Sequence, residues 1–512
     1  MNGPWSRGRH ARWRLSPRQV FLTFFALTFI AMGCWAFASP LVAAPDEQAH
    51  MIRAYAIDHG QLGHDAGVYN LSLVDVTVPA SINFSKAYPR CFQFKGLISA
   101  RCAPAWSTST TMVDTTTYVG HYPPLYYMLV GVGSYVSVQK SGLYWMRLAS
   151  SLVCALMVAM SAYVIARWSR RRVVAAGVAL SLTPMVWFLA ASVNPSGFEI
   201  VTAICLWTAL SVFVVDHPDN PPRALVAIIA ASASVLVLVR GLSPLFVAII
   251  GVVVGVVIGP SALMRLWRQR RDVKIAVAAV VAAAGAAAAW IFTQGTLNIA
   301  PDGVKVDSGT GELTIINLVV HRIPLWLHES VGILGWLDTP MPHWFYDLWY
   351  VMVAVLFVGG LVAAAWRSKA ALVAVAVLCV LVPVVLVTKQ VHQIGIVWQG
   401  RDSMPLTVGV PILGAALWAR SRSARSGPRL TAAAMVVLVT LLTFGGFYLN
   451  LRRYAVGRAG SRLFFLHSGG WSPPTGSLAT LLVYGVVTVV LGALTLAYLL
   501  NTRAKDDAFT LT

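Results

Sequence analysis

The sequence predicts an all-α polytopic membrane protein with about 12 transmembrane helices. Hydrophobic residues make up 57% of the 512 residues and charged residues only 11%. The mean hydropathy is +0.70. The apolar residues form long unbroken runs such as 275–292, unlike the short alternating segments of a membrane β-barrel. Because backbone groups in lipid must bond within their own segment, such runs are expected to be helices.

The N-terminal apolar window is expected to be the first span. The basic segment RGRHARWR before it, and LVAA before Pro45, would also suit a cleaved signal peptide. We favour a span, because the window is longer than a signal-peptide core and proline follows the candidate cleavage site. The apolar windows that we expect to be spans are 19–44, 142–166, 173–192, 197–215, 223–240, 243–260, 274–293, 347–366, 370–388, 403–419, 429–449 and 477–500.

The basic residues set the expected orientation. With a cytoplasmic N-terminus, the clusters WSRRR (168–172), RLWRQRR (265–271), WRSK (366–369) and ARSRSARSGPR (419–429) all fall on the cytoplasmic side. Counting the apolar segment 122–138 as a further span would invert them, so we expect it to lie in the outer interface. The net charge of +20 is therefore interpreted as a topology signal and not as a nucleic-acid-binding surface. Both termini are therefore expected to be cytoplasmic.

Residues 1–512 are expected to form a single transmembrane domain with three long extracytoplasmic loops, 45–141, 294–346 and 450–476. The first loop is too long for a simple turn, so we expect it to fold on the membrane surface with interfacial helices of its own. Cys91 and Cys102 lie in this loop and are candidates for a disulfide if it faces an oxidising compartment. The other four cysteines fall in apolar spans.

The motif PDEQAH at 45–50 places two carboxylates and a histidine where the first span ends. On a helix, Asp46 and His50 form an i, i+4 pair, and Glu47 and His50 an i, i+3 pair. Ionisable side chains at a membrane edge are costly unless paired, hydrated or used, so this cluster is a candidate functional site. The alternative is an ordinary interfacial charge cluster.

Further motifs give the acidic pair a context. GHYPPLYY follows at 120–127, and QGRD begins a late span at 399–402. An acidic pair after the first span, followed by a His-Tyr-Pro-Pro-Leu-Tyr-Tyr segment, resembles the glycosyltransferase C (GT-C) superfamily. That superfamily includes protein mannosyltransferases and lipid A aminoarabinose transferases, which take a sugar from a polyprenyl-phosphate carrier.

The likeness is closer to the bacterial family called domain of unknown function 2142. SVNPSG (192–197), GWLDTPMP (335–342) and QGRD resemble its motifs, and the resemblance covers about 20–500. Two positions depart from the pattern: Ser196 stands where an acid is frequent, and Asp402 where an aromatic residue is usual.

The resemblance implies an integral membrane glycosyltransferase that crosses a bacterial plasma membrane several times. It would move a sugar from a polyprenyl-phosphate donor to a cell-envelope glycan, glycolipid or protein at an extracytoplasmic active site. The acceptor hydroxyl needs a base, for which Asp46 is the first candidate and Glu47 the second. The phosphate leaving group needs cations and no acid, which suits Arg401 and, as reserves, Arg240 or the pair Lys389 and His392.

The remaining candidates are polar residues on the same predicted face. His50, His121, Tyr122, Asp338 and Gln399 are expected to contact substrate or lipid phosphate. Snorkelling explains Arg240 and Lys389 equally well, and an interfacial aromatic belt explains the tyrosines. His343 is a further sugar-site candidate. Glu199, near Asn194, is expected to bond across helices in a structural role.

Two other functions stay open. A transporter or flippase of lipid-linked or polar substrates fits a count of about 12 spans, although the charges gather at one face and not at the bilayer midplane. A non-catalytic scaffold also fits. The sequence has no GxxxxGK[ST] motif, so nothing supports ATP-driven export by this chain alone. A divalent metal at the acidic pair is left open.

Overall fold

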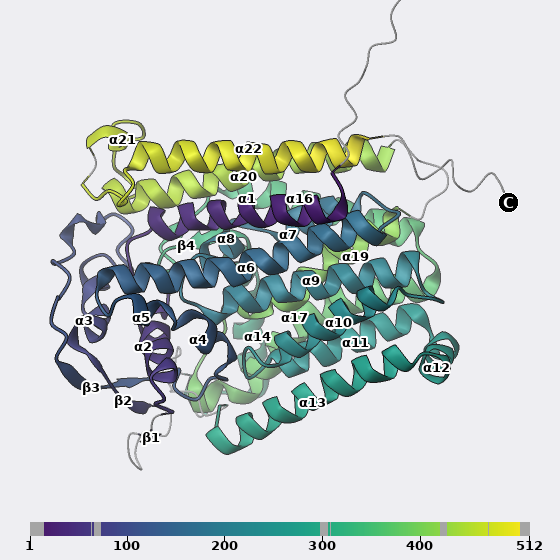
Figure 1. Ribbon diagram of the computed structural model, residues 1–512, viewed down its shortest axis with the longest axis horizontal. Helices are drawn as coiled ribbons and strands as arrows, with labels where there is room; N and C mark the ends of the chain where they lie inside the picture. The colour runs from purple at the N-terminus through teal and green to yellow at the C-terminus, as the bar shows by residue number, and fades with distance from the viewer. Residues whose placement is uncertain are drawn as a thin grey trace, which may run out of the picture.

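The computed structural model describes residues 15–62, 64–65, 73–296, 306–307, 309–419, 427–468 and 470–501. They form a bundle of long helices that run roughly side by side, with the first loop folded over one end (Figure 1). Eight helices in this part of the chain are long and apolar enough to cross a membrane. They are α1 (Pro17–Ala38), α6 (Lys140–Trp168), α9 (Pro195–Asp216), α13 (Arg271–Gln294), α16 (His343–Ala363), α17 (Trp366–Ile394), α20 (Gly427–Val456) and α22 (Ser477–Leu500).

The other four predicted windows also hold helices, but shorter or broken ones. They contain α7 (Val174–Ser181) with α8 (Pro184–Ala190), α10 (Arg223–Val237), α11 (Ser243–Ile258), and α18 (Gly400–Thr407) with α19 (Gly409–Trp418). α11 and α12 (Pro260–Gln269) pass the membrane test together but are bent by 102°, which makes a ninth candidate span. The all-α polytopic fold class is confirmed, and the helix pattern is consistent with about 12 spans.

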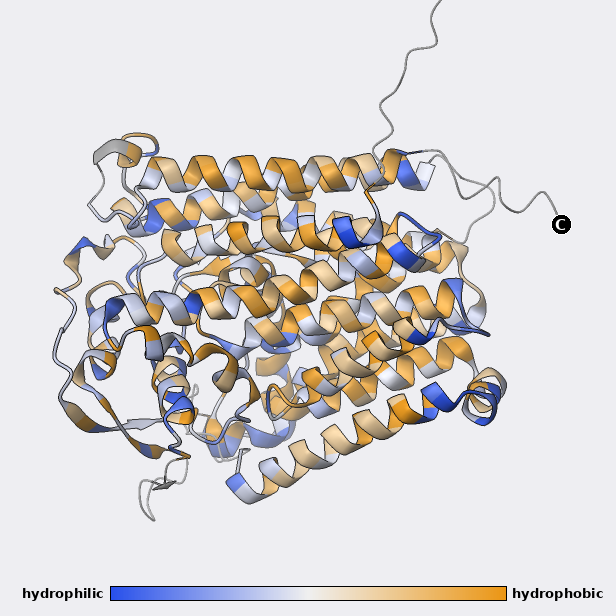
Figure 2. Cartoon of the chain, viewed as in Figure 1, coloured by the Kyte–Doolittle hydropathy of each residue, from blue (hydrophilic) through white to orange (hydrophobic). Residues whose placement is uncertain are grey.

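The basic clusters meet at the end of the bundle where α1 begins and α22 ends, which we call the terminal end. Arg172 Nη1 donates to the Tyr498 carbonyl at 3.0 Å. The backbone N–H of Arg170 donates to Asp216 at 2.9 Å, and Arg270 Nη2 to the Pro221 carbonyl at 2.8 Å. Hydrophobic residues dominate the helix middles, while hydrophilic residues gather toward the ends (Figure 2). The described parts of the predicted same-side clusters therefore lie at one end, and residues 420–426 of the fourth cluster lie outside the described residues.

The opposite end, the loop end, carries the first loop. It contains the expected short helices α2 (Glu47–Asp58), α3 (Ala80–Asn83), α4 (Leu125–Val130) and α5 (Gly133–Val136), and the 3₁₀ turns Phe84–Lys86, Tyr88–Cys91 and Ala100–Cys102. It also contains an antiparallel sheet, β1 (His64–Asp65), β2 (Val74–Pro79) and β3 (Met112–Thr117), that the sequence analysis did not predict.

The segment that becomes β2 does alternate, as a half-buried strand should. Val74, Val76 and Val78 are buried, whereas Asp75 is exposed. The run is six residues long, and its partner β3 begins at Met112. A signal this short, paired across such a gap, is weak in a chain dominated by long apolar helices.

The segment 122–138 does not span. It forms the short helices α4 and α5, which together are too short to cross a bilayer. They pack on α2 and α6, while Met128, Tyr135 and Val136 stay exposed. This arrangement fits the interfacial position that we expected.

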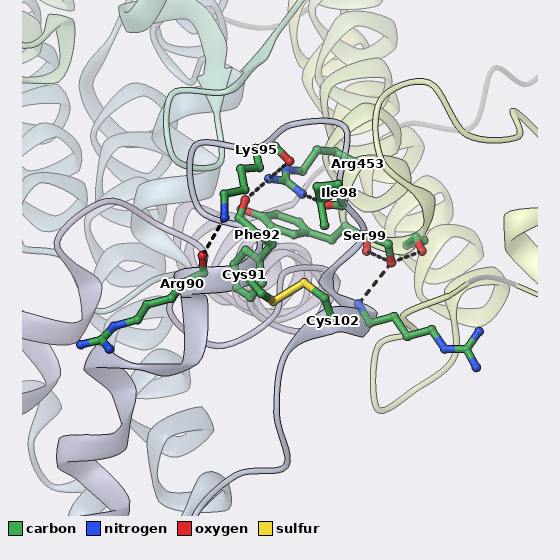
Figure 3. The surroundings of a disulfide bond; sticks show 11 residues. Arg90, Cys91, Phe92, Lys95, Ile98, Ser99, Cys102 and Arg453 are labelled. Carbon is green, nitrogen blue, oxygen red and sulfur yellow. Dashed lines mark hydrogen bonds between the residues drawn. A yellow bond between two sulfur atoms is a disulfide. The ribbon is translucent and has the colours of Figure 1, made fainter.

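Cys91 and Cys102 form the predicted disulfide. Figure 3 shows Arg453, from α20, pointing into the loop that the disulfide closes. Arg453 donates to the carbonyls of Phe92 and Ile98, each at 2.8 Å. Ser99 Oγ donates to the Ala455 carbonyl at 2.7 Å. The loop is thus fastened to the end of α20.

The second long loop holds α14 (Glu312–Val320), α15 (Ile323–Gly332) and the two-stranded ribbon β4 (Ile333–Leu334) and β5 (Thr339–Pro340). The third holds α21 (Phe465–Ser468). α15 packs against α18 and α8, so the second loop closes over the start of α18.

Candidate active site

The site begins in the connector between α1 and α2. α1 ends at Ala38, before Pro40, and residues 41–44 are almost fully buried. Val42 (φ 59°) and Asp46 (φ 66°) both adopt left-handed backbone conformations. That conformation is unusual for any residue with a side chain, and most of all for a β-branched one. Strained backbone of this kind clusters at functional sites.

Asp46 lies at the centre of a polar cluster at the loop end. One carboxylate oxygen accepts a hydrogen bond from the Tyr118 hydroxyl at 2.8 Å, and the other is paired with Arg401 Nη2. The side chain is 28% exposed, so the cluster is open on this side. Burial by itself would raise the pKa of Asp46, but the charge of Arg401 and the bond from Tyr118 outweigh it and lower the pKa below its usual value.

Arg401 has hydrogen-bonding capacity to spare. Its Nε and Nη1 are buried and have no partner among the described residues, and the same holds for Gln399 Oε1. A cavity of about 10 Å³ lies against Arg401, Gln399 and Glu329, which is room for one water. Buried guanidinium N–H groups are costly to leave unpaired. Arg401 is therefore equipped to bind a further acceptor.

The start of α18 is held firmly in place. Gly400 N donates to Glu329 Oε2 at 2.6 Å, and Ser330 Oγ donates to the Gly400 carbonyl at 3.0 Å. A Cβ at Gly400 would come within 2.0 Å of the Trp326 carbonyl, so only glycine fits here. Burial raises the pKa of Glu329 to about 6. α15 thereby fixes the position from which Arg401 projects.

Arg240 joins two carboxylates beside this pair. Its Nη1 donates to Glu199 and its Nη2 to Asp402, both at 3.0 Å. Ser243 Oγ donates to the second oxygen of Glu199 at 2.6 Å. Arg240 also lies 5.9 Å from the centre of the Tyr122 ring, within cation–π range. Its guanidinium is therefore held inside the protein and does not snorkel.

His50 lies in the same cluster but makes a different bond from the one expected. Its Nδ1 bonds the Tyr127 hydroxyl at 2.8 Å, and its ring lies 6.0 Å from that of Tyr122. Burial, opposed by the charge of Asp46 and assisted by the charges of Arg401 and Arg240, lowers the pKa of His50 to about 3. The imidazole is therefore neutral near pH 7.

Glu47 is directed away from the open cluster. Arg147 donates two hydrogen bonds to it, from Nε to Oε1 at 2.7 Å and from Nη2 to Oε2 at 2.6 Å. Val193 N adds a third at 3.0 Å. Arg147 also donates to the carbonyls of Ala36, Ser39 and Pro40. Both charged side chains are at most 1% exposed, so the pair ties α2 to the end of α1, to α6 and to the segment before α9.

Several other candidates contact residues outside this cluster. Asp338 is bonded by Arg453 and Thr339 beneath the disulfide loop. The His121 carbonyl accepts bonds from Trp290 at 3.0 Å and Thr296 at 2.7 Å. Lys389 forms an exposed pair with Glu312 on α14. His343 lies 6.2 Å from His328, ring to ring. The structure thus gathers Asp46, His50, Tyr122, Arg240, Gln399 and Arg401.

The sequence analysis did not name three residues that shape this site. Tyr118 lies just before the GHYPPLYY motif and gave no separate signal. Glu329 lies in the second long loop, and the hydrophobic periodicity of the sequence does not predict how that loop folds. Arg147, however, is an isolated cation within an apolar window, and such a residue in a span calls for a buried partner. Among the described residues, no group of three or more His, Cys, Asp or Glu is arranged to hold a metal ion.

Two solved structures resemble this one distantly. ArnT from Cupriavidus metallidurans in the apo state has 16% sequence identity and a TM-score of 0.44. The same protein bound to undecaprenyl phosphate has 15% identity and a TM-score of 0.42. Each match covers 93% of this chain and 76% of the other. No curated protein sequence matches the chain. The family model described as "Predicted membrane protein (DUF2142)" matches residues 29–410, most of the chain, and the protein therefore belongs to that family.

Proposed function

We propose that this protein is an integral membrane glycosyltransferase of the GT-C type. It takes a sugar from a polyprenyl-phosphate donor and transfers it to an acceptor hydroxyl on the extracytoplasmic side of a bacterial plasma membrane. The observation that carries this proposal is the pair of Asp46 and Arg401. An ionised carboxylate there adjoins a guanidinium of which two nitrogens have no partner among the described residues. The first suits a base, and the second suits a phosphate.

The reaction is a single displacement. The oxygen of the acceptor hydroxyl attacks the anomeric carbon of the sugar while Asp46 accepts the proton of that hydroxyl. The bond from the anomeric carbon to the phosphate oxygen breaks, and its electron pair leaves with the phosphate. The configuration at the anomeric carbon is thereby inverted. Arg401 holds the developing phosphate charge through Nε and Nη1. Because the adjoining cavity holds about one water, the phosphate must approach from the exposed side of Asp46, and Arg401 must turn toward it.

The other residues of the cluster are proposed to position Asp46 and Arg401. Arg240, which is itself paired with Glu199, pairs with Asp402, the neighbour of Arg401, while Glu329 accepts a hydrogen bond from Gly400 N. His50, as a neutral imidazole, and Tyr122 border the cluster and are proposed to contact sugar hydroxyls. Glu47 and Asp338, both gripped by arginines, are proposed to be structural anchors. Of the two departures from the family pattern, Asp402 has a local role, because it pairs with Arg240.

An assay in detergent separates a transferase from a flippase. Lipid extracts from cells that lack the gene, which would accumulate the donor, are mixed with the purified protein and an acceptor fraction from the same cells. Detergent removes the two leaflets, so a flippase has no detectable activity there. A transferase still transfers the sugar from donor to acceptor. We expect mass spectrometry to show loss of the polyprenyl-phosphate sugar and an acceptor heavier by that sugar. No transfer in detergent, with transport restored in sealed vesicles, would favour the flippase.

A further inference from the structure

A large apolar cavity begins at the terminal end of the bundle and extends inward between the helices. It has a volume of about 510 Å³, in the range of ligand sites. Leu15, Val20, Phe24 and Thr28 line it from the start of α1, whereas Asp46 follows the other end of that helix. Since α1 has 22 residues, the outer end of the cavity, at Leu15, lies about 30 Å from Asp46, while its inner end, at Thr28, is about 15 Å from the end of α1. A phosphate at Arg401 therefore does not reach the outer end of this cavity.

The walls are built from six helices. α6, α7, α20 and α22 join α1 around the cavity, and α8 contributes Trp187. Most of the lining side chains are aliphatic, such as Val158, Ala179, Val436 and Leu491. Such a groove in a membrane-spanning bundle takes up a hydrocarbon chain more readily than water, because burying each methylene contributes about 0.8 kcal/mol.

The charged lining residues are all of one sign. Arg170, Arg172 and Arg429 line the cavity, and none of its described lining residues is acidic. Asp216, the nearby carboxylate, is occupied by the Arg170 backbone N–H and the Arg171 side chain. Arg172 is held in place by the Tyr498 carbonyl and by the Tyr498 ring, whose centre lies 5.4 Å away. The apolar groove therefore has a fixed cationic rim.

We propose that this groove binds an anionic glycerophospholipid, with an acyl chain between α1, α6, α7, α20 and α22 and the phosphate at the arginine rim. In the proposed topology this end faces the cytoplasm, whose leaflet is rich in anionic lipid headgroups. The charge of the rim selects an anionic headgroup over a zwitterionic one. The lipid would fasten the first helix to the last two and so stabilise the bundle.

Native mass spectrometry of the purified, delipidated full-length protein tests this proposal. The probes are phosphatidylglycerol and phosphatidylethanolamine with identical acyl chains. We expect preferential retention of phosphatidylglycerol. Each of Arg170→Gln and Arg429→Gln should weaken its binding about fivefold, as the loss of one cation near a membrane surface predicts. Ala179→Phe should fill the groove and reduce binding of both lipids.

The matched control is Arg268→Gln on α12, a cation at the same end that does not line the groove, and it should leave binding unchanged. A cooperative thermal unfolding transition in each variant shows that the variant is folded, so that a loss of lipid binding is not caused by a loss of structure. Equal retention of the two lipids, or binding that the groove variants leave intact, would overturn the proposal. So would displacement of phosphatidylglycerol by an equal amount of undecaprenyl phosphate, because the occupant would then be an isoprenyl phosphate.

Discussion

Arg401 Nη2 bonds the Asp46 carboxylate although 355 positions separate the two residues in the sequence. The bond joins the connector after α1 to the start of α18. It places a carboxylate and a cation at one point, and Nε and Nη1 of the guanidinium have no partner in the part of the chain that the structure describes. The predictions below depend on this pairing and on the buried groups that hold it in position.

Arg401→Lys should retain the charge but lose the fork that grips phosphate oxygens. Losing one charge-assisted hydrogen bond costs about 1.5–3 kcal/mol, so we expect donor affinity to fall roughly tenfold to a hundredfold. Titration of the purified variant with undecaprenyl phosphate measures this. The exposed Arg90→Lys, in the first loop, is the control. Unchanged affinity in Arg401→Lys would remove Arg401 from the phosphate site.

Glu47→Gln should destabilise the protein strongly, because Arg147 would be left as a buried, unpaired charge. Breaking such a pair from one side costs about 3–5 kcal/mol. Thermal unfolding in detergent measures the effect. Glu312→Gln breaks an exposed pair with Lys389 and should cost about 1 kcal/mol at most. A Glu47→Gln protein that is fully stable yet inactive would instead make Glu47 a reacting group.

The pKa of Glu329 predicts a pH dependence of stability. Burial raises this pKa from its ordinary 4.5 to about 6, so between these values the folded state binds more protons than the unfolded state. Stability should therefore fall as pH rises from about 4.5 to about 6, by roughly 2 kcal/mol in total. Glu329→Gln should lack this component. The difference between wild-type and variant melting temperatures across this range measures it, and identical pH profiles would refute it.

The disulfide should stabilise the first loop against unfolding. Cys91 and Cys102 are 11 positions apart, and closing a loop of that size is worth about 3 kcal/mol in the chain-entropy model. The double variant Cys91→Ser and Cys102→Ser should lower the melting temperature, and dithiothreitol should lower that of the wild type but not that of the variant. If the reductant destabilises both equally, the disulfide is not the cause.

The sequence predicted the helical part of the fold well, because long apolar windows and basic clusters act over many residues. The site was predicted in part. Asp46, Arg401 and Arg240 do meet, as charged groups at one membrane edge should. The partner of each charge was not predictable, because those bonds join distant segments: Glu47 with Arg147, and Asp338 with Arg453. The strand β2 was missed because six residues give little periodicity.

The most direct test of the account is sugar transfer by Asp46→Asn in the detergent assay. The replacement keeps the size of the side chain and removes the base, so we expect the rate to fall by about a hundredfold to ten-thousandfold with the melting temperature nearly unchanged. Asp114→Asn is the matched control, since Asp114 is an exposed aspartate of the same loop that bonds Thr77, and it should transfer at the wild-type rate. A folded Asp46→Asn protein that transfers sugar as fast as the wild type would contradict the account.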